Sequence, residues 1–310
     1  MRFSLCPPAW IVFAASIATI VCSTHAAPRC PGGVPGLRTR VVAGALLVTP
    51  VIINGSGPFD FMVDTGSQLT VIDPPLAALL NLKSQSTVGL LAATRQFQAS
   101  LVVPDSIEAG SHAVTSPLVA VQDLGPIQAA DPHIRGVLGE DFLAHFDLLI
   151  DYGRSLVCLD DSKAMQPQIR GERIPLIPPF AHPEGEAPFA DRLVISVRLS
   201  DTGNMAILLQ LDSGSDGPIL YSGNSALEEP LLKRAKARAS GATEAQRAFA
   251  VLPPQDVRIG ARTIHNVPFV TPAGAGQNLP DRETNGLLAT VLFQRVYVNH
   301  TDRYVILDPR

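Results

Sequence analysis

Short apolar stretches alternate with turn residues along most of this chain. Apolar residues dominate 51–53 and 59–61, and Asn54-Gly55 between them is a hairpin signal. Gly, Pro, Asn and Ser punctuate both halves of the sequence in the same way. The strongest helical spacing lies over residues 226–240. The pattern therefore predicts an all-β fold with one helix of note.

This pattern of strands and turns is duplicated. Residues 61–67 read Phe-Met-Val-Asp-Thr-Gly-Ser, and residues 209–215 read Leu-Gln-Leu-Asp-Ser-Gly-Ser, at an offset of 148 residues. Two more pairs match in the same order at an offset of 150 residues: 107–110 with 257–260, and 136–139 with 286–289. Unrelated hairpins would share composition but not order and spacing, so we interpret the chain as an internal repeat.

The repeat divides the chain into two lobes behind a leader. We predict a first lobe over residues 27–165 and a second lobe over 191–310. The segment 166–190 between them is rich in proline and is predicted to be the connection.

The first residues predict a signal peptide over 1–26. Arg2 supplies the positive start, residues 9–21 are apolar, and Thr24-His25-Ala26 fits a cleavage site. An uncleaved membrane anchor is the alternative, although the apolar run is short for a bilayer span. We therefore expect an exported protein, periplasmic or secreted, with no stable membrane association after cleavage.

Composition and cysteine usage bound the function further. The 310 residues are 46% hydrophobic, which allows a sizeable core, and the net charge of −4 argues against nucleic-acid binding. Cys6 and Cys22 fall in the predicted signal region, which leaves Cys30 and Cys158. In an oxidising compartment these two form either one disulfide or two separate thiols, and the sequence leaves both open.

Asp64 and Asp212 are the candidate catalytic residues. Each ends an apolar strand and begins an Asp-(Thr/Ser)-Gly-Ser motif, one in each half of the repeat. Two carboxyl groups held close together do not both ionise, so they share one proton, and one group acts as base while the other is the donor. Asp201-Thr202-Gly203 is half a motif, and we interpret it as a turn because it occupies the repeat position of Asn54-Gly55.

The duplicated motif resembles that of the aspartic proteases, and the lobe pattern resembles the retropepsin-like branch. The first lobe also has Val137-Leu138-Gly139 followed by Asp141-Phe142-Leu143, which is similar to that branch. The resemblance covers nearly all of the mature chain and is stronger over residues 52–159 than over 193–307. It implies a two-lobed aspartic protease fold with barrel-like β lobes and a cleft between them. It also implies an endopeptidase that activates water without a metal or another cofactor.

The resemblance assigns roles to the residues beside the two acids. Gly66 and Gly214 are expected to leave space where the two backbones and a substrate meet. The hydroxyls of Thr65 and Ser213 are expected to hydrogen-bond across the lobe interface. Two further serines are expected to donate their hydroxyls to the carboxylates: Ser67 and Ser215.

By the same resemblance, a hairpin after the first motif is expected to act as a flap over an extended polypeptide substrate. Residues 87–89 are the first-lobe candidate, with Gly89 as a substrate-binding position. Gly241 is the corresponding candidate in the second lobe. The first-lobe segment contains no tyrosine, which again favours the retropepsin-like comparison.

Two other interpretations stay open. Ala289 stands where the first lobe has Gly139, and a distorted second loop would leave a module that binds extended peptides without cutting them. Alternatively, only the first lobe is catalytic and two chains pair. Because both acids belong to one chain, a complete site does not require a dimer.

Other hydrolytic chemistries lack their motifs in this sequence. The histidines after residue 26 show no His-Glu-x-x-His spacing, so we predict no metal site and interpret them as turn and surface residues: His112, His133, His145, His182, His265 and His300. A Gly-x-Ser-x-Gly nucleophile motif and a phosphate-binding loop are also missing from the sequence. The function predicted is that of an exported aspartic endopeptidase.

Overall fold

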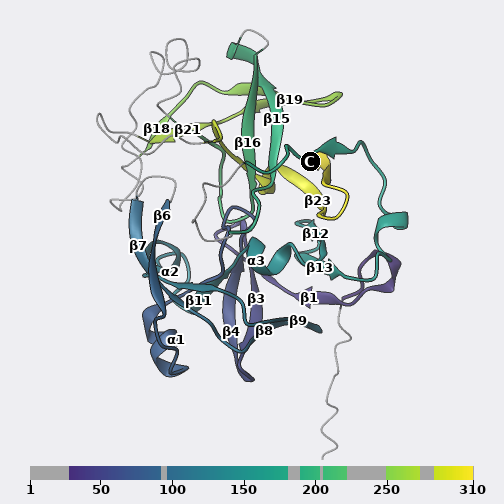
Figure 1. The fold of residues 1–310 in the computed structure, drawn as a ribbon. Helices are drawn as coiled ribbons and strands as arrows, with labels where there is room; N and C mark the ends of the chain where they lie inside the picture. The colour runs from purple at the N-terminus through teal and green to yellow at the C-terminus, as the bar shows by residue number, and fades with distance from the viewer. Residues whose placement is uncertain are drawn as a thin grey trace, which may run out of the picture.

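The computed structural model describes residues 28–91, 96–180, 189–202, 205–221, 249–272 and 283–309. Four predictions lie outside these ranges: the signal peptide over 1–26, the surface position of His182, the helix over 226–240 and the flap position Gly241. Figure 1 shows the strands of the first half in the lower part of the view and those of the second half in the upper part. The described strands form three sheets.

The first lobe is a ten-stranded sheet with the order β6-β7-β10-β5-β11-β4-β3-β8-β9, and β2 pairs with β3. Its strands are β2 (Arg40–Val42), β3 (Leu46–Ile53), β4 (Ser56–Val63), β5 (Val71–Ile72), β6 (Ser86–Leu91), β7 (Gln96–Val102), β8 (Ser106–Ala109), β9 (His112–Thr115), β10 (Val119–Val121) and β11 (Ile134–Leu138). Strands β4 and β11 run parallel, with Val63 opposite Leu138. Asp64, the residue after β4, therefore lies beside the end of β11.

The second lobe repeats this arrangement in an eight-stranded sheet with the order β18-β21-β17-β22-β16-β15-β19-β20. Its strands are β15 (Val194–Leu199), β16 (Ala206–Asp212), β17 (Ile219–Leu220), β18 (Phe249–Val251), β19 (Gln255–Ile259), β20 (Arg262–Val267), β21 (Val270–Pro272) and β22 (Gly286–Ala289). Strands β16 and β22 run parallel, with Leu211 opposite Leu288. The matched segments of the sequence thus occupy matched places in two sheets, and the predicted duplication is confirmed.

The hairpins that precede the two acids also match. Strands β3 and β4 are joined by Asn54 and Gly55, with φ of 50° and 71°. Positive φ at both positions suits the tight turns that join twisted strands. Strands β15 and β16 are joined through the 3-10 helix η3 (Ser200–Thr202). The interpretation of Asp201 as a turn residue is therefore confirmed.

A six-stranded third sheet is shared by the two lobes, with the order β1-β13-β12-β23-β24-β14. Its strands are β1 (Gly36–Arg38), β12 (Asp147–Asp151), β13 (Leu156–Asp160), β14 (Ile174–Pro175), β23 (Phe293–Asn299) and β24 (Tyr304–Pro309). Strand β12, at the end of the first lobe, pairs antiparallel with β23, at the end of the second, and Leu149 lies opposite Tyr297. These ladder hydrogen bonds hold the lobes together away from the two acids.

The helices are short. They are α1 (Pro74–Leu79), α2 (Gly125–Gln128) and α3 (Glu140–Leu143), with the 3-10 helices η1 (Pro31–Gly33), η2 (Gln166–Gln168) and η5 (Thr290–Leu292). Asp73 caps α1, because its Oδ1 accepts a 2.7 Å hydrogen bond from the N–H of Leu76. Within the ranges described, no helix is long and apolar enough to cross a membrane.

One apolar core runs through both lobes and the shared sheet. Its largest fully buried side chains include Phe61 and Phe142 of the first lobe, Phe269 of the second, and Phe293 of β23. The alternation of apolar and polar residues places one face of each lobe sheet in this core. The prediction of an all-β fold with two similar lobes is confirmed.

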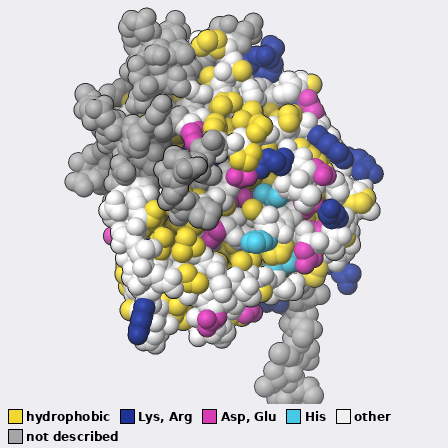
Figure 2. Space-filling view, viewed as in Figure 1, with side chains coloured by type: hydrophobic (Ala, Val, Ile, Leu, Met, Phe, Trp, Pro, Cys, Tyr) yellow, Lys and Arg dark blue, Asp and Glu magenta, His cyan; other side chains and the backbone are white. Residues whose placement is uncertain are grey.

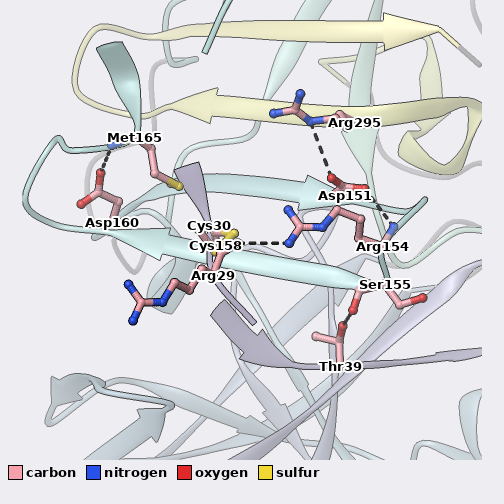
Figure 3. Close-up of a disulfide and its surroundings, with 10 residues drawn as sticks. All are labelled: Arg29, Cys30, Thr39, Asp151, Arg154, Ser155, Cys158, Asp160, Met165 and Arg295. Atoms are coloured by element: carbon pink, nitrogen blue, oxygen red, sulfur yellow. Dashed lines mark hydrogen bonds and ion pairs between the residues drawn. A yellow bond between two sulfur atoms is a disulfide. The ribbon is translucent and has the colours of Figure 1, made fainter. Parts of the chain in front are cut away.

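Cys30 and Cys158 form a disulfide, which confirms one of the two alternatives left by the sequence. Cys158 lies on β13 opposite Gly36 of β1, so the bridge holds the start of the described chain against the shared sheet (Figure 3). Close by, the Arg154 guanidinium donates to the Arg29 carbonyl at 3.1 Å. The N-terminal segment is therefore fastened to the sheet by covalent and polar contacts.

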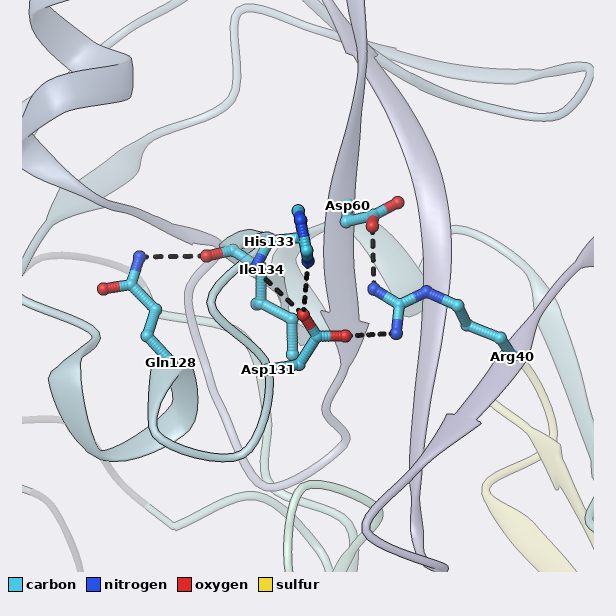
Figure 4. A network of polar contacts seen from close by, with 6 residues as sticks. All are labelled: Arg40, Asp60, Gln128, Asp131, His133 and Ile134. Carbon is cyan, nitrogen blue, oxygen red and sulfur yellow. Dashed lines mark hydrogen bonds and ion pairs between the residues drawn. The ribbon is translucent and has the colours of Figure 1, made fainter.

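A polar network fastens β2 to the first lobe (Figure 4). The Arg40 guanidinium pairs with Asp60 at 2.7 Å and also with Asp131. The backbone N–H of His133 and the Arg40 guanidinium lower the pKa of Asp131 to about 2. Asp131 therefore stays ionised in acid, and the network keeps its charge pairing there.

Candidate active site

Asp64 and Asp212 lie face to face where the two lobes meet, and we call this pair the dyad. The Asp64 N–H donates to the Leu138 carbonyl at 3.0 Å, and Asp212 is the last residue of β16, opposite Ala289. The two carboxyl groups lie close enough for a hydrogen bond between them to affect the pKa of both. Such a bond requires a proton, because ionised carboxylates only accept. The fold thus brings together the two acids that the repeat singled out.

Backbone N–H groups surround both carboxyl groups. The N–H of Gly66 donates to Asp64 Oδ1, and the N–H of Gly214 donates to Asp212 Oδ1, both at 2.7 Å. The Gly214 N–H also reaches the Asp64 carboxyl. Further donors are the backbone N–H groups of the next residue in each motif, Ser67 and Ser215. These donors stabilise an ionised carboxyl, so the site holds one negative charge.

Burial and mutual repulsion shift the titration of the dyad upward. Burial raises the pKa of Asp64, and the surrounding N–H donors oppose that change. Burial and then the charge of Asp64 raise the pKa of Asp212 well above its ordinary value. The two groups titrate as one unit, because each proton that leaves changes the field at the other carboxyl. The dyad therefore keeps one proton at a pH where ordinary carboxyl groups have lost theirs.

The two motif glycines face the acid of the opposite lobe. A Cβ atom at Gly66 would lie 2.6 Å from Asp212 Cγ, and one at Gly214 would lie 2.4 Å from Asp64 Cγ. Contacts this short are not tolerated by real side chains. The expectation that both glycines provide space is confirmed.

The residues after the two acids join the lobes. The Thr65 hydroxyl donates to the Leu211 carbonyl at 3.1 Å, and the Ser213 hydroxyl donates to the Val63 carbonyl at 2.9 Å. Each hydroxyl oxygen also accepts the backbone N–H of the other residue, at 3.0 and 3.1 Å. Four hydrogen bonds thus form a closed set across the interface, as the resemblance implied, and we call this set the interlobe grip.

The prediction that the Ser67 and Ser215 hydroxyls donate to the carboxylates was wrong. The Ser67 hydroxyl donates to the Leu69 carbonyl, and the Ser215 hydroxyl donates to the Gly217 carbonyl, both at 2.6 Å. A short serine side chain satisfies its hydroxyl locally by bonding to the backbone two residues on. Both serines support the carboxyl groups through their backbone N–H groups instead.

Gly89 lies in β6 and is exposed, opposite Gln98 of β7. The β6–β7 hairpin is therefore present where a first-lobe flap was predicted. Residues 92–95 at its tip lie outside the described ranges. Substrate binding at Gly89 stays a prediction.

Ala289 fits its lobe without a change of register. It is fully buried and continues the ladder of β22 opposite Asp212. In the first lobe, a Cβ atom at Gly139 would lie 2.4 Å from the Leu69 carbonyl oxygen. Glycine is thus needed for space in the first lobe, while the second lobe accommodates a methyl group at the matching place.

Two residues that make contacts near the dyad were not predicted from the sequence. The Gln210 amide donates to the Gly66 carbonyl at 2.9 Å, across the lobe interface. A polar residue within the apolar strand before Asp212, where the first lobe has Met62, was the available signal. His300, assigned to the surface, is instead mostly covered, with 11% of its side chain exposed, and is hydrogen-bonded to Glu140 at 2.9 Å. The two residues are 160 positions apart, so no local pattern predicts their contact.

His112 is also buried rather than exposed, because its ring packs edge-on against Phe146. Among the residues that the structure describes, no three His, Cys, Asp or Glu side chains gather as metal ligands.

Comparison with known proteins relates the first lobe to a known family. Residues 49–142 match the aspartyl protease family. No curated protein matches the chain. Among solved structures, a retropepsin-like aspartic protease from Rickettsia conorii is 20% identical, with 40% of this chain and 90% of that chain covered and a TM-score of 0.28. An aspartic proteinase from Irpex lacteus is 13% identical, with 89% of this chain and 96% of that chain covered and a TM-score of 0.47.

The family match spans β4, β11 and the first motif, which are the elements that position Asp64. The second lobe adds the matching motif on β16 and the same parallel strand pair. By the match over its first lobe, the chain is similar to the aspartyl protease family.

Proposed function

We propose that the chain is an exported aspartic endopeptidase whose dyad activates a water molecule against a peptide bond. The observation that carries this proposal is the close approach of the Asp64 and Asp212 carboxyl groups at the lobe interface, where each carboxyl lies against the motif glycine of the opposite lobe. The family match over residues 49–142 supports a protease-type function independently.

The shared proton gives the pair both halves of the chemistry. The ionised carboxyl accepts a proton from water while the water oxygen attacks the carbonyl carbon of the peptide. The protonated carboxyl donates its proton to the developing oxyanion, which avoids a separate charge in the site. The proton taken from water then passes to the leaving nitrogen as the carbon–nitrogen bond breaks. One hydroxyl of the diol intermediate gives its proton to the other carboxylate, so the products are a carboxylic acid and an amine and the dyad regains its single proton. The protein forms no covalent bond to the substrate in this sequence of steps.

The substrate proposed is a polypeptide in extended conformation, held between the lobes and covered by the β6–β7 hairpin. Extended peptides pair readily with strand edges. Both acids belong to one chain, so a single chain contains a complete dyad. Export to the periplasm or the medium is proposed from the signal pattern over 1–26, and the Cys30–Cys158 disulfide is what an oxidising compartment favours.

The experiment is cleavage of an unfolded protein substrate at acid pH by the wild type, Asp64→Asn and Asp201→Asn. Asp201 begins the Asp-Thr-Gly sequence that resembles half of the motif but lies in a turn, so its variant is a matched control. We expect Asp64→Asn to lose at least about a thousandfold in kcat/KM and Asp201→Asn to retain activity. A wild type that binds the extended peptide without cutting it would instead identify a peptide-binding module.

A further inference from the structure

A second pair of titratable groups, Glu140 and His300, lies directly behind the dyad. Glu140 follows β11 and begins α3, and its N–H donates to the Ser67 carbonyl at 2.8 Å. The backbone of Glu140 is thus hydrogen-bonded to the loop that contains Asp64. That side chain is only 1% exposed.

His300 is 160 positions from Glu140 in the sequence. It lies between β23 and β24 of the shared sheet, and its side chain is 11% exposed. Its Nδ1 is 2.6 Å from the Phe146 carbonyl oxygen, and its Nε2 is 2.9 Å from Glu140 Oε2. Figure 2 shows histidine and acidic side chains close together over the middle of this face, where Figure 1 draws α3 and β12.

The hydrogen bonds fix the number of protons in this pair. A carbonyl oxygen only accepts, so Nδ1 carries a proton. The bond between Nε2 and Oε2 contains one further proton, whichever atom holds it. The pair is neutral overall in either case, with its acidic end next to the dyad loop.

Within the described part of the chain, His300 is the residue that favours the ionised form of the Glu140 carboxyl. Among the described residues, the second oxygen of Glu140, Oε1, is buried without a hydrogen-bond partner. Burial raises the pKa of Glu140, while His300 opposes that change, and the charge of Asp64 raises it further. Burial alone would lower the pKa of His300, but Glu140 and the Phe146 carbonyl outweigh burial and raise it.

The other titratable groups around this pair are few. The dyad loop contributes Asp64, α3 contributes Asp141, and the shared sheet contributes Asp147, which accepts a 2.7 Å hydrogen bond from the Tyr297 hydroxyl. Asp302 lies in the same turn as His300, and its charge raises the pKa of Asp147. Glu140 is the group of this set whose charge interacts with Asp64.

We infer that the Glu140–His300 pair positions the Asp64 loop and sets the acid limit of the pH range in which the dyad holds a single proton. This inference rests on the proposed function. With the pair intact, the partial negative charge of Glu140 makes the dyad a stronger proton acceptor. Without it, the dyad takes up its second proton only at lower pH.

Two variants test the inference independently. Glu140→Gln removes the charge and keeps the shape, while His300→Gln removes the compensation, so that the buried Glu140 carboxyl becomes neutral in acid. Both variants leave an uncharged side chain at position 140 under acid conditions. We therefore expect a shift in the same direction in both: the lower titration step of the dyad moves to lower pH by about half a unit or more.

The control is His265→Gln. His265 also pairs with a carboxyl at 2.9 Å, that of Asp256, but this pair is exposed on the second lobe, and its loss should leave the dyad unchanged. The titration is read by carbon NMR of labelled aspartate carboxyl groups, with the dyad signals assigned from Asp64→Asn. This readout needs no turnover, so it stands even if the wild type does not cleave peptides.

The acid limb of kcat/KM should move by the same amount as the dyad titration. A folded Glu140→Gln or His300→Gln protein whose dyad titrates as in the wild type would overturn the inference. A wild type without cleavage, but with the predicted NMR shift in the variants, would overturn the proposed function and leave the inference standing.

Discussion

A methyl group at Gly214 would lie 2.4 Å from Asp64 Cγ, and this distance defines the tightest constraint on a single residue in the site. Gly214→Ala should therefore separate the two carboxyl groups and reduce kcat/KM by at least about a hundredfold. Gly217→Ala is a matched control in the same loop, because a Cβ atom there meets nothing within 4 Å. Equal activity of the two variants, measured on one peptide substrate, would contradict this account of Gly214.

Asp141 predicts how the stability of the protein changes with pH. Burial raises the pKa of Asp141 to about 7 from its ordinary value of 3.8, against a hydrogen bond from the Thr70 hydroxyl. The folded protein therefore holds a proton that the unfolded chain has released, and its stability falls as the pH rises between these values. The loss above pH 7 is on the order of 4 kcal/mol.

Asp141→Asn removes this dependence and keeps an acceptor for Thr70. We expect the variant to unfold with a free energy similar to that of the wild type near pH 4 and to be roughly 2–4 kcal/mol more stable at pH 8. Urea denaturation at both pH values measures the difference. A constant difference between the two proteins across that range would show that Asp141 does not titrate in this way.

At the scale of residues, the sequence identified the dyad because both acids belong to a duplicated motif. It also predicted Gly66, Gly214, Thr65 and Ser213 correctly. It was wrong for the serine hydroxyls, since several acceptors compete for a hydroxyl and the nearest carbonyl is local. It did not predict His300 beside Glu140, because that contact depends on how the shared sheet brings distant segments together.

Among the elements, the interlobe grip makes the clearest prediction. Ser213→Ala removes the acceptor of the Thr65 N–H and the donor to the Val63 carbonyl, both in buried surroundings. Leaving such groups unpaired should cost about 1–3 kcal/mol of unfolding free energy. Ser84→Ala is the control, because that hydroxyl makes a single exposed bond at 3.2 Å. Similar losses in the two variants would mean that the grip does not stabilise the interface.

The strands of each lobe could be predicted from the chain, because apolar alternation and turn residues are local signals. The β3–β4 hairpin and its counterpart, β15–β16, follow directly from Asn54-Gly55 and from the repeat. The pairing of β12 with β23 could not be predicted in this way. Both segments are rich in strand-forming residues, but their sequences do not specify which sheet edge each one joins.

For the whole molecule, the disulfide and the shared sheet decide how the halves stay together. The Cys30–Cys158 bridge closes a span of 128 residues, and a loop of this length restricts the unfolded chain strongly. Replacing both cysteines with alanine should lower the unfolding free energy by about 2–5 kcal/mol. Denaturation in urea, with and without reductant, measures this loss. A wild type insensitive to reductant under unfolding conditions would contradict it.

The central claim is that Asp212 completes the site begun by Asp64 within one chain. The most direct measurement is kcat/KM of Asp212→Asn at acid pH, with the mass of the active species determined in the same buffer. The account predicts that this variant loses activity as fully as Asp64→Asn, by at least about a thousandfold, and that the active wild type contains one chain. Activity that survives in Asp212→Asn, carried by a dimer of first lobes, would contradict it.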